Sequence, residues 1–202
     1  MSQILLIKSS PRNDSYSTRV ASALAQKLIS QNPGSRLTER DLHGAPLPHI
    51  DDTFATARNT PPEKLTTAQR AALSQSDELL KELFAADIII IAAAMINFGI
   101  PSSLKAYIDH IVRPGVAFRY GEKGPEGLIK GKKLYIVAAR GGVYSQGPMQ
   151  AYNFQDTYLR AVLAFVGITD VEVIAVEGVA FGPEAAEKAF TAALTQVSAV
   201  AA

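Results

Sequence analysis

The sequence predicts an α/β fold in which five parallel strands form a doubly wound sheet with helices on both faces. The clearest sign is the central strand, because Asp87 is followed by four isoleucines and three alanines that end at Ala94. Unbroken apolar runs of this kind are typical of strands buried on both faces of a parallel sheet. Four further strand patterns alternate with helical patterns along the chain, which indicates parallel connections. Five such strands fit the strand order 2-1-3-4-5.

That order is the flavodoxin-like one, and it puts the switch point of the sheet between the first and third strands. Ligands of open α/β sheets bind at such a point, outside the carboxyl ends of the strands. The loop at 9–17 follows the first strand, the loop at 95–102 follows the third, and the loop at 139–145 follows the fourth. We therefore expect these three loops to border one crevice.

The expected strands are short apolar or β-branched runs between turn formers. They cover 4–7, 37–42, 88–94, 132–139 and 171–176. The expected helices show apolar residues at helical spacing and end near glycine or proline. They cover a segment from Ser17, which could be its N-cap, to Asn32, then 77–86, 102–112, 150–166 and a closing segment from Pro183.

Two segments interrupt this alternation. Residues 43–74 are rich in proline and aspartate, and they predict an ordered surface insertion with a short helical piece at 63–73. Residues 113–130 hold a short aromatic run at 116–120 followed by glycines, which indicates a hairpin or an excursion off the sheet. No repeat or linker divides the chain, so we expect residues 1–202 to form a single domain with insertions near 43–74 and 113–130.

The composition narrows the classes of function. The chain has 48% apolar and 19% charged residues, a net charge of +1 and no cysteine. The near-neutral charge gives no electrostatic case for binding nucleic acid or an anionic membrane, and the lack of cysteine excludes disulfides and thiolate chemistry. The longest apolar run, 88–96, is shorter than the roughly 20 residues that span a bilayer. With no signal-peptide pattern after Met1, we expect a soluble, cytoplasmic protein.

The first loop offers the hydroxyl groups of Ser10, Ser15 and Ser17 at the start of a helix. Helix N-termini bind phosphate through free N–H groups and the helix dipole. The chain has neither a glycine-rich dinucleotide fingerprint nor a Walker A loop, so this loop suits a single terminal phosphate. The alternative is that these serines only cap the helix and turn the chain, since serine is a preferred cap residue.

The second loop, Met95-Ile96-Asn97-Phe98, presents a thioether, an amide and an aromatic ring beside Gly99. Such a wall suits a planar ring whose heteroatoms accept hydrogen bonds from backbone N–H groups. The alternative is that Met95 and Phe98 fill the core and Asn97 is a turn residue. The position of the loop at the switch point favours the ligand-binding interpretation.

The third loop, Arg140-Gly141-Gly142, also follows a strand, and its two glycines permit the close approach of a ligand. The alternative is an ordinary loop. No catalytic acid, base or nucleophile stands out. No metal site is expected either, because the three histidines lack metal-ligand spacing and suit surface or capping roles. This absence fits a protein whose cofactor carries the chemistry.

Several motifs along the chain match one known family. They are Lys8-Ser9-Ser10, Ser15-Tyr16-Ser17, Met95-Ile96-Asn97-Phe98-Gly99-Ile100-Pro101, Arg113-Pro114-Gly115-Val116-Ala117-Phe118-Arg119-Tyr120, Gly124-Pro125-Glu126-Gly127-Leu128, Arg140-Gly141-Gly142, Gly167-Ile168-Thr169 and Glu177-Gly178. On these motifs the chain resembles the FMN-dependent NADH-azoreductases, also called FMN-dependent NADH:quinone oxidoreductases, of the flavodoxin-like superfamily. The matches extend from the first strand to the last helix.

The resemblance implies a single FMN-binding domain that holds one FMN per subunit in the three loops. The implied cofactor-binding residues are Ser10, Ser15, Tyr16, Ser17, Met95, Ile96, Asn97, Phe98, Ala139, Arg140, Gly141 and Gly142. The residues of the first loop would hold the phosphate, those of the second would lie along the flavin ring, and those of the third would meet its pyrimidine end. Tyr120 and Phe165 match positions where the family places aromatic residues near the substrate.

The implied activity is that of an FMN-dependent oxidoreductase, which uses NADH to reduce quinones and to cleave aromatic azo compounds. The implied mechanism is ping-pong, because NADH reduces FMN and leaves before the acceptor enters the same place. Hydride would go to flavin N5, and the N–H groups of Gly141 and Gly142 are candidates to stabilise negative charge toward N1 and O2. The resemblance also implies a homodimer with two active sites at the subunit interface.

Two positions depart from the family, because Ile96 stands where tyrosine is common and Ala139 where serine is common. Backbone contacts survive both changes and side-chain hydrogen bonds do not, so we expect FMN to bind with an altered substrate preference or flavin potential. The alternatives are a flavodoxin-type electron carrier, an NAD(P)H:FMN reductase, and an interaction module without cofactor. Flavodoxin-type carriers resemble one another in being strongly acidic, unlike this chain.

Overall fold

The structure is a computed structural model, and it describes residues 1–201. Its main sheet contains five parallel strands in the order β2-β1-β3-β6-β7, which confirms the predicted order 2-1-3-4-5. These strands are β1 (Gln3–Lys8), β2 (Arg36–Asp41), β3 (Ile88–Ala94), β6 (Lys133–Arg140) and β7 (Asp170–Glu177). A separate antiparallel hairpin consists of β4 (Phe118–Gly121) and β5 (Gly124–Gly127).

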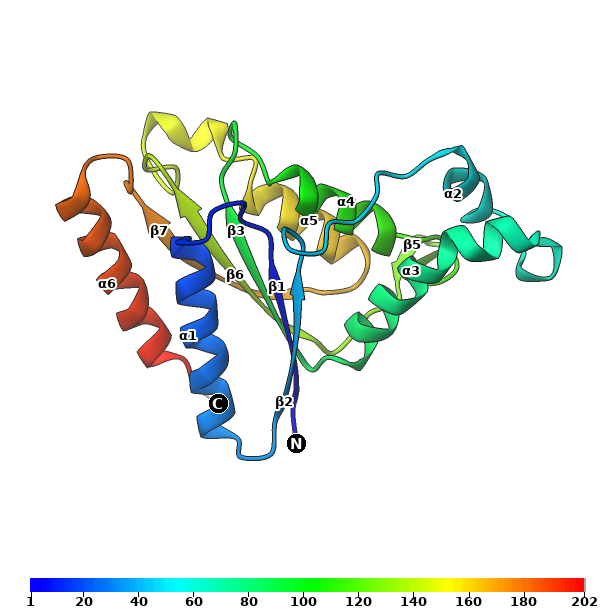
Figure 1. Cartoon of the computed structure of the whole chain (residues 1–202), viewed down its shortest axis with the longest axis horizontal. Helices are drawn as coiled ribbons and strands as arrows, with labels where there is room; N and C mark the ends of the chain where they lie inside the picture. The colour runs from blue at the N-terminus through cyan, green and yellow to red at the C-terminus, as the bar shows by residue number, and fades with distance from the viewer. Residues whose placement is uncertain (202) are drawn as a thin grey trace.

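Helices cover both faces of the sheet, as predicted (Figure 1). They are α1 (Tyr16–Gln31), α2 (Asp52–Ala57), α3 (Thr67–Ala85), α4 (Ser102–Ile111), α5 (Asp156–Phe165) and α6 (Pro183–Ala199), with short 3₁₀ helices η1 (Pro62–Lys64) and η2 (Pro148–Tyr152). α1 and α6 lie on one face, and α3, α4 and α5 lie on the other. No helix within residues 1–201 combines the length and apolar character needed to cross a bilayer.

The core has two layers, and β3 belongs to both. Ile89 and Ile91 pack with α3, α4 and α5, whereas Ile90 and Ala92 pack with α1 and α6. All four side chains are at most 1% exposed. A strand needs an unbroken apolar run only when helices cover both of its faces, which accounts for the run seen in the sequence.

Two helices begin or extend differently from the prediction. The N-cap of α1 is Ser15, not Ser17, because Ser15 Oγ accepts a hydrogen bond from the N–H of Thr18 at 3.4 Å. The predicted pieces at 63–73 and 77–86 are joined in the single helix α3, apart from the start of the first piece, which belongs to η1. Thr66 and Gln69 form a capping box that starts this helix. Beyond it, no glycine or proline interrupts the helix before Ala85.

The helix predicted at 150–166 is also divided. It consists of η2 and α5, with residues 153–155 between them outside the helical path. In this gap the N–H of Phe154 donates to the carbonyl of Phe98 at 3.1 Å, and Gln155 Nε2 donates to the carbonyl of Ala93 at 3.0 Å. Because the backbone N–H of Phe154 bonds to the turn after β3 rather than to a carbonyl one helical turn earlier, the helical pattern is broken there.

The two segments that interrupt the βα alternation lie beside the main sheet (Figure 1). Residues 113–130 contain the β4–β5 hairpin, as predicted, and Ile129 N–H donates to the carbonyl of Val166 at 2.9 Å. Residues 43–74 contain α2, η1 and the start of α3, and Phe54 packs against the ring of His110 at 4.8 Å. His110 is therefore only 2% exposed, and the prediction of a surface or capping role is wrong for it.

Candidate functional site

The loop after β1 brings polar groups to the carboxyl edge of the sheet. Ser9 anchors it, because its N–H and Oγ both donate to a carbonyl at the end of β3, at 3.2 and 2.8 Å. Ser10 is 9% exposed, and its Oγ accepts from the N–H of Arg12 at 3.3 Å. The N–H groups of Tyr16 and Ser17 lie in the first turn of α1, where no intrahelical acceptor exists. The start of α1 therefore presents free amide donors and hydroxyls, which suit an anion.

The turn after β3 has a left-handed backbone. Ile96 and Gly99 exchange two backbone hydrogen bonds of 3.0 Å, which closes a two-residue turn. Both central residues have positive φ, 47° for Asn97 and 69° for Phe98. Asparagine tolerates this region, whereas a bulky residue loses roughly 1–2 kcal/mol there. The Phe98 ring lies 5.2 Å from that of Tyr152, and Ile96 remains 44% exposed at the edge of the turn.

The loop after β6 is held through its carbonyl groups. The carbonyls of Arg140, Gly141 and Gly142 accept hydrogen bonds of 3.2, 3.0 and 3.0 Å from the N–H groups of residues 178–180. The N–H groups of Gly141 and Gly142 have no protein acceptor within residues 1–201. Two fixed donors are therefore left for a ligand.

The three loops enclose one cavity of about 300 Å³, which confirms that they meet at the carboxyl edge. Ligand sites typically begin at about this size. Its lining residues are Ser10, Arg12, Asp14, Ser15, Tyr16, Ala94, Met95, Ile96, Ala139, Arg140, Gly141, Val179 and Ala180. The guanidinium of Arg12 has no acidic partner in the part of the chain that the structure describes. No group of side chains suited to a metal ion occurs among those residues.

Eight of the twelve predicted cofactor residues line this cavity, and four do not. Ser17 is fully buried, with its Oγ 3.0 Å from Ser15 Oγ. Asn97 and Phe98 shape the turn without lining the cavity. Gly142 lines a neighbouring, more open cavity of about 800 Å³. The roles of all twelve in cofactor binding stay predictions.

Tyr120 lies on β4 and Phe165 at the end of α5, and neither is part of this cavity. Both pack against Phe118, at ring distances of 5.6 and 4.6 Å. Neither lines the cavity of its own chain, and Tyr120 is 75% exposed. Their predicted role near the substrate is therefore not explained within one copy of the chain.

Sequence reasoning missed several lining residues. Arg12 and Asp14 lie among turn formers of the first loop and carried no signal of their own. Val179 and Ala180 follow β7, and they reach the cavity because the chain folds back onto the loop after β6. The positive φ of Gly178, 78°, permits that reversal, and the Glu177-Gly178 motif was the signal that could have located it.

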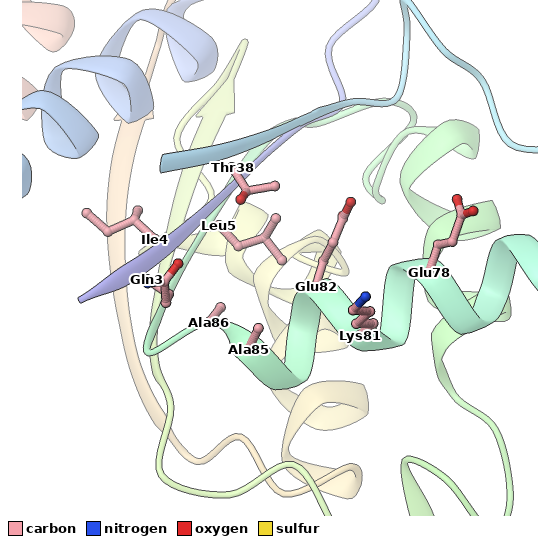
Figure 2. A pocket seen from close by; sticks show the side chains of 9 residues that line it. All are labelled: Gln3, Ile4, Leu5, Thr38, Glu78, Lys81, Glu82, Ala85 and Ala86. Atoms are coloured by element: carbon pink, nitrogen blue, oxygen red, sulfur yellow. The ribbon is translucent and has the colours of Figure 1, made fainter. Parts of the chain in front are cut away.

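A separate cavity of about 340 Å³ lies between α3 and the first two strands (Figure 2). Figure 2 shows Gln3, Ile4 and Leu5 on one side and Glu78, Lys81 and Glu82 of α3 on the other. It opens near the amino end of β1, whereas ligands of α/β sheets bind at the carboxyl ends. It is not the candidate site.

Comparisons with known proteins agree with this geometry. A family profile described as a flavodoxin-like fold matches residues 2–201. A protein of Rhizobium etli named FMN-dependent NADH:quinone oxidoreductase 1 is 56% identical over 201 residues, covering 100% of this chain and 98% of its own. A protein of Mesorhizobium japonicum named FMN-dependent NADH:quinone oxidoreductase is 50% identical, covering 98% of this chain and 95% of its own. The chain belongs to the FMN-dependent NADH:quinone oxidoreductase family.

Solved structures of azoreductases share the fold of this family member. An azoreductase from Bacillus anthracis matches with a TM-score of 0.90 and 29% identity, covering 98% of this chain and 97% of the other. An FMN-dependent NADH-azoreductase from Bacillus anthracis, solved in complex with FMN, matches with a TM-score of 0.86 and 25% identity, covering 98% of both chains.

The cofactor that names the family fits the residues of this cavity. A phosphate needs the free amides and hydroxyls that the start of α1 supplies. A flavin ring is planar and carries acceptor atoms at one end, which suits an open turn beside the unpaired N–H groups of Gly141 and Gly142. Ala139 is 8% exposed and lines the cavity, and its methyl group cannot donate the hydrogen bond of a serine.

Proposed function

We propose that this chain is an FMN-dependent oxidoreductase that uses NADH to reduce quinones and to cleave aromatic azo compounds in a ping-pong, two-electron mechanism. The cavity carries this proposal. It joins the free amides at the start of α1 to the unpaired N–H groups of the loop after β6, with an open apolar turn between them. Membership of the family supports the same activity.

We propose that Ser10, Ser15 and the N–H groups of Tyr16 and Ser17 bind the FMN phosphate. Arg12 adds an unpaired positive charge at the same wall of the cavity. Met95, Ile96, Asn97 and Phe98 would lie along the ring, and Ala139, Arg140, Gly141 and Gly142 would meet its pyrimidine end. When bound, FMN would accept a hydride equivalent from NADH and pass two electrons to the acceptor, so one round reduces a quinone, and two rounds with two NADH cleave an azo bond to two amines.

The protein itself orients the cofactor and stabilises charge. The carbonyls of the loop after β6 are bonded to residues 178–180, so the N–H groups of Gly141 and Gly142 are fixed before a ligand arrives. Donors fixed in this way stabilise developing negative charge without reorganisation. No side chain of the cavity is required as a nucleophile, which is consistent with chemistry carried by the cofactor.

A homodimer with an active site at each side of the subunit interface is part of the proposal. Tyr120 lies away from the cavity of its own chain and is 75% exposed, so it is free to reach the site of a partner. Phe154 and Phe181 are also exposed, at 58% and 69%. Exposed aromatic side chains of this kind are enriched at protein interfaces. A cytoplasmic location and a single FMN-binding domain over the chain complete the proposal.

A turnover assay tests the activity. Protein purified with FMN should oxidise NADH steadily only when a quinone is added, and it should consume an azo dye at the expense of NADH. A flavodoxin-type carrier would hold FMN without such turnover, and an NAD(P)H:FMN reductase would turn over with free FMN as its acceptor. A protein that gains no flavin absorbance with excess FMN would contradict all three. Sedimentation analysis of the same preparation tests the dimer.

The role of the loop after β6 has its own test. A Cβ atom on Gly141 would lie 3.4 Å from Ala180 Cβ, so Gly141→Ala fits without backbone strain. Gly141→Phe should weaken FMN binding or slow flavin reduction, because the larger side chain occupies the cavity, whereas Gly141→Ala should do neither. Equal kinetics in Gly141→Phe and the wild type would rule out the role proposed for this position.

A further inference from the structure

Arg140 forms a buried polar network beneath the cavity. Its side chain is 2% exposed, with Nε 2.9 Å from Gln155 Oε1 and Nη1 2.8 Å from Glu177 Oε1. Its Nη2 donates to the carboxylate of Asp156. A guanidinium offers its five N–H donors in a fixed planar fork, so three separate acceptors hold this one rigidly. Each of the three guanidinium nitrogens therefore donates to the protein, so the side chain is held in this network rather than presented to a cofactor.

The network joins the ends of three strands. Arg140 ends β6 and Glu177 ends β7, and the two residues are register partners. Gln155 is fully buried and donates from Nε2 to the carbonyl of Ala93, next to the end of β3. Through these contacts one guanidinium connects the end of β3, the ends of β6 and β7, and the start of α5.

Glu177 extends the network into the loop after β6. Its carboxylate accepts from the N–H of Tyr144 at 2.8 Å and from the hydroxyl of Ser145. Burial alone would raise the pKa of Glu177, but the hydrogen bonds from Ser145, Tyr144 and Arg140 outweigh it and lower the pKa below its ordinary value. The carboxylate is therefore ionised where it holds both ends of the 140–145 segment, which includes Gly141 and Gly142.

We propose that Arg140 is a positioning residue, which acts through Glu177 and Gln155 to fix the N–H groups of Gly141 and Gly142 against the flavin. This inference rests on the proposed function. It assigns Arg140 a role different from direct cofactor contact through its side chain. It also explains why a charged residue occupies a fully buried position, where an isolated charge is strongly disfavoured.

The chain offers a matched control. Arg113 is similarly buried, at 7% exposed, and its Nη1 donates to Ser76 Oγ at 3.0 Å and to the carboxylate of Asp77. None of these residues lines the cavity. Arg113→Gln should therefore lower stability by removing a buried guanidinium and its bonds to Ser76 and Asp77, without affecting the flavin, whereas Arg140→Gln should affect both.

The experiment compares the wild type with Arg140→Gln, Arg140→Lys and Arg113→Gln. Thermal unfolding without FMN measures stability, and FMN titration measures affinity. The midpoint potential of bound FMN and the rate of its reduction by NADH, at saturating FMN, are also measured. We expect Arg140→Gln to weaken FMN binding and to slow reduction by roughly tenfold to a hundredfold, the scale of a misplaced catalytic group. Arg140→Lys should rescue little, because one ammonium cannot span three acceptors. Arg113→Gln should keep the affinity, potential and reduction rate of the wild type.

Arg140→Gln with the affinity, potential and reduction rate of Arg113→Gln would overturn the positioning role. If Arg140→Gln does not fold, Glu177→Gln replaces it, because this change leaves Arg140 bonded to Gln155 and Asp156 and removes only the charge that holds the loop. Wild-type flavin kinetics in Glu177→Gln would then overturn the proposal. A wild-type protein that binds no FMN would instead refute the proposed function, and the positioning role with it.

Discussion

A Cβ atom added to Gly127 would lie 2.2 Å from the backbone nitrogen of Gly167, so the hairpin strand β5 touches the chain directly after α5. Real Cβ atoms do not approach backbone so closely. Gly167 itself has a φ of 108°, which strains any other residue. This glycine pair fixes the hairpin that carries Tyr120 to the body of the molecule.

Gly127→Ala should therefore destabilise the protein. The backbone must shift to admit the methyl group, and overpacking of this kind costs roughly 1–3 kcal/mol in the free energy of unfolding. Urea unfolding measures the loss. Gly121→Ala in the same hairpin is the control, because its Cβ would meet only one carbonyl oxygen, at 3.8 Å. Equal stabilities of the two variants would contradict the close contact.

The left-handed turn after β3 predicts a specific order of stability at position 97. Asn97→Val should lower the free energy of unfolding by about 1–2 kcal/mol, because a β-branched residue resists positive φ. Asn97→Gly should stay close to the wild type, since glycine adopts a φ of 47° freely. Chemical denaturation of the protein without FMN would reveal the order, and a stable Asn97→Val would refute it.

Ser15 and Ser17 both lie at the start of α1, but the structure gives their side chains different surroundings. Ser15→Ala removes the N-cap and should cost about 1 kcal/mol of stability. It should also weaken FMN binding, because Ser15 lines the cavity. Ser17→Ala should weaken FMN binding less, because Ser17 is buried outside the lining. Fluorescence titration with FMN compares the variants, and a larger loss in Ser17→Ala would contradict the geometry.

The residue at position 96 should affect which electron acceptor is preferred rather than how tightly FMN binds. Ile96 lines the cavity and is 44% exposed, so Ile96→Tyr can place a hydroxyl at its edge without disturbing the core. We expect the FMN affinity of Ile96→Tyr to stay within about threefold of the wild type, a difference of less than about 1 kcal/mol. The ratio of the kcat/KM values for quinone and azo acceptors should change. Ile96→Phe supplies the ring without the hydroxyl. If Ile96→Phe changes the ratio equally, hydrogen bonding is not the cause.

The lowered pKa of the Glu177 carboxyl group predicts how the stability of the protein depends on pH. Its pKa is lowered in the folded protein, so its contribution to stability is present above 4.5, the ordinary value for glutamate, and is lost as the pH falls through the lowered pKa. The stability difference between wild type and Glu177→Gln should therefore shrink as the pH falls below 4.5. Unfolding curves at a series of pH values measure it.

Glu126 is the control for this effect. Its pKa is also lowered, by Lys130 and Arg119, but its side chain is 41% exposed, and solvent screens such surface pairs. Glu126→Gln should leave stability nearly unchanged at every pH. A constant difference between wild type and Glu177→Gln over the acid range would show that the ionised carboxylate does not contribute as proposed.

Much of the fold was predictable because it depends on local patterns. The apolar run at 88–94 and the turn formers after each strand predicted the sheet, its order and the crevice. The division of the helix predicted at 150–166 was not predictable. It accompanies a backbone bond from Phe154 to Phe98, which lies far away in the chain, and periodicity contains no such information.

The strand order, the three loops at the carboxyl edge and, through the motifs, the family all follow from the amino-acid sequence without coordinates. The period of apolar residues, the turn-forming residues and the motifs all depend on residues close together in sequence, so they can be recognised without a structure. Three features became visible only in the folded chain. They are the side chains that line the cavity, the bonds of the Arg140 guanidinium to Gln155, Asp156 and Glu177, and the hold of residues 178–180 on the loop after β6. Those contacts join segments far apart in sequence, and burial and hydrogen bonding between such segments exist only once the chain has folded.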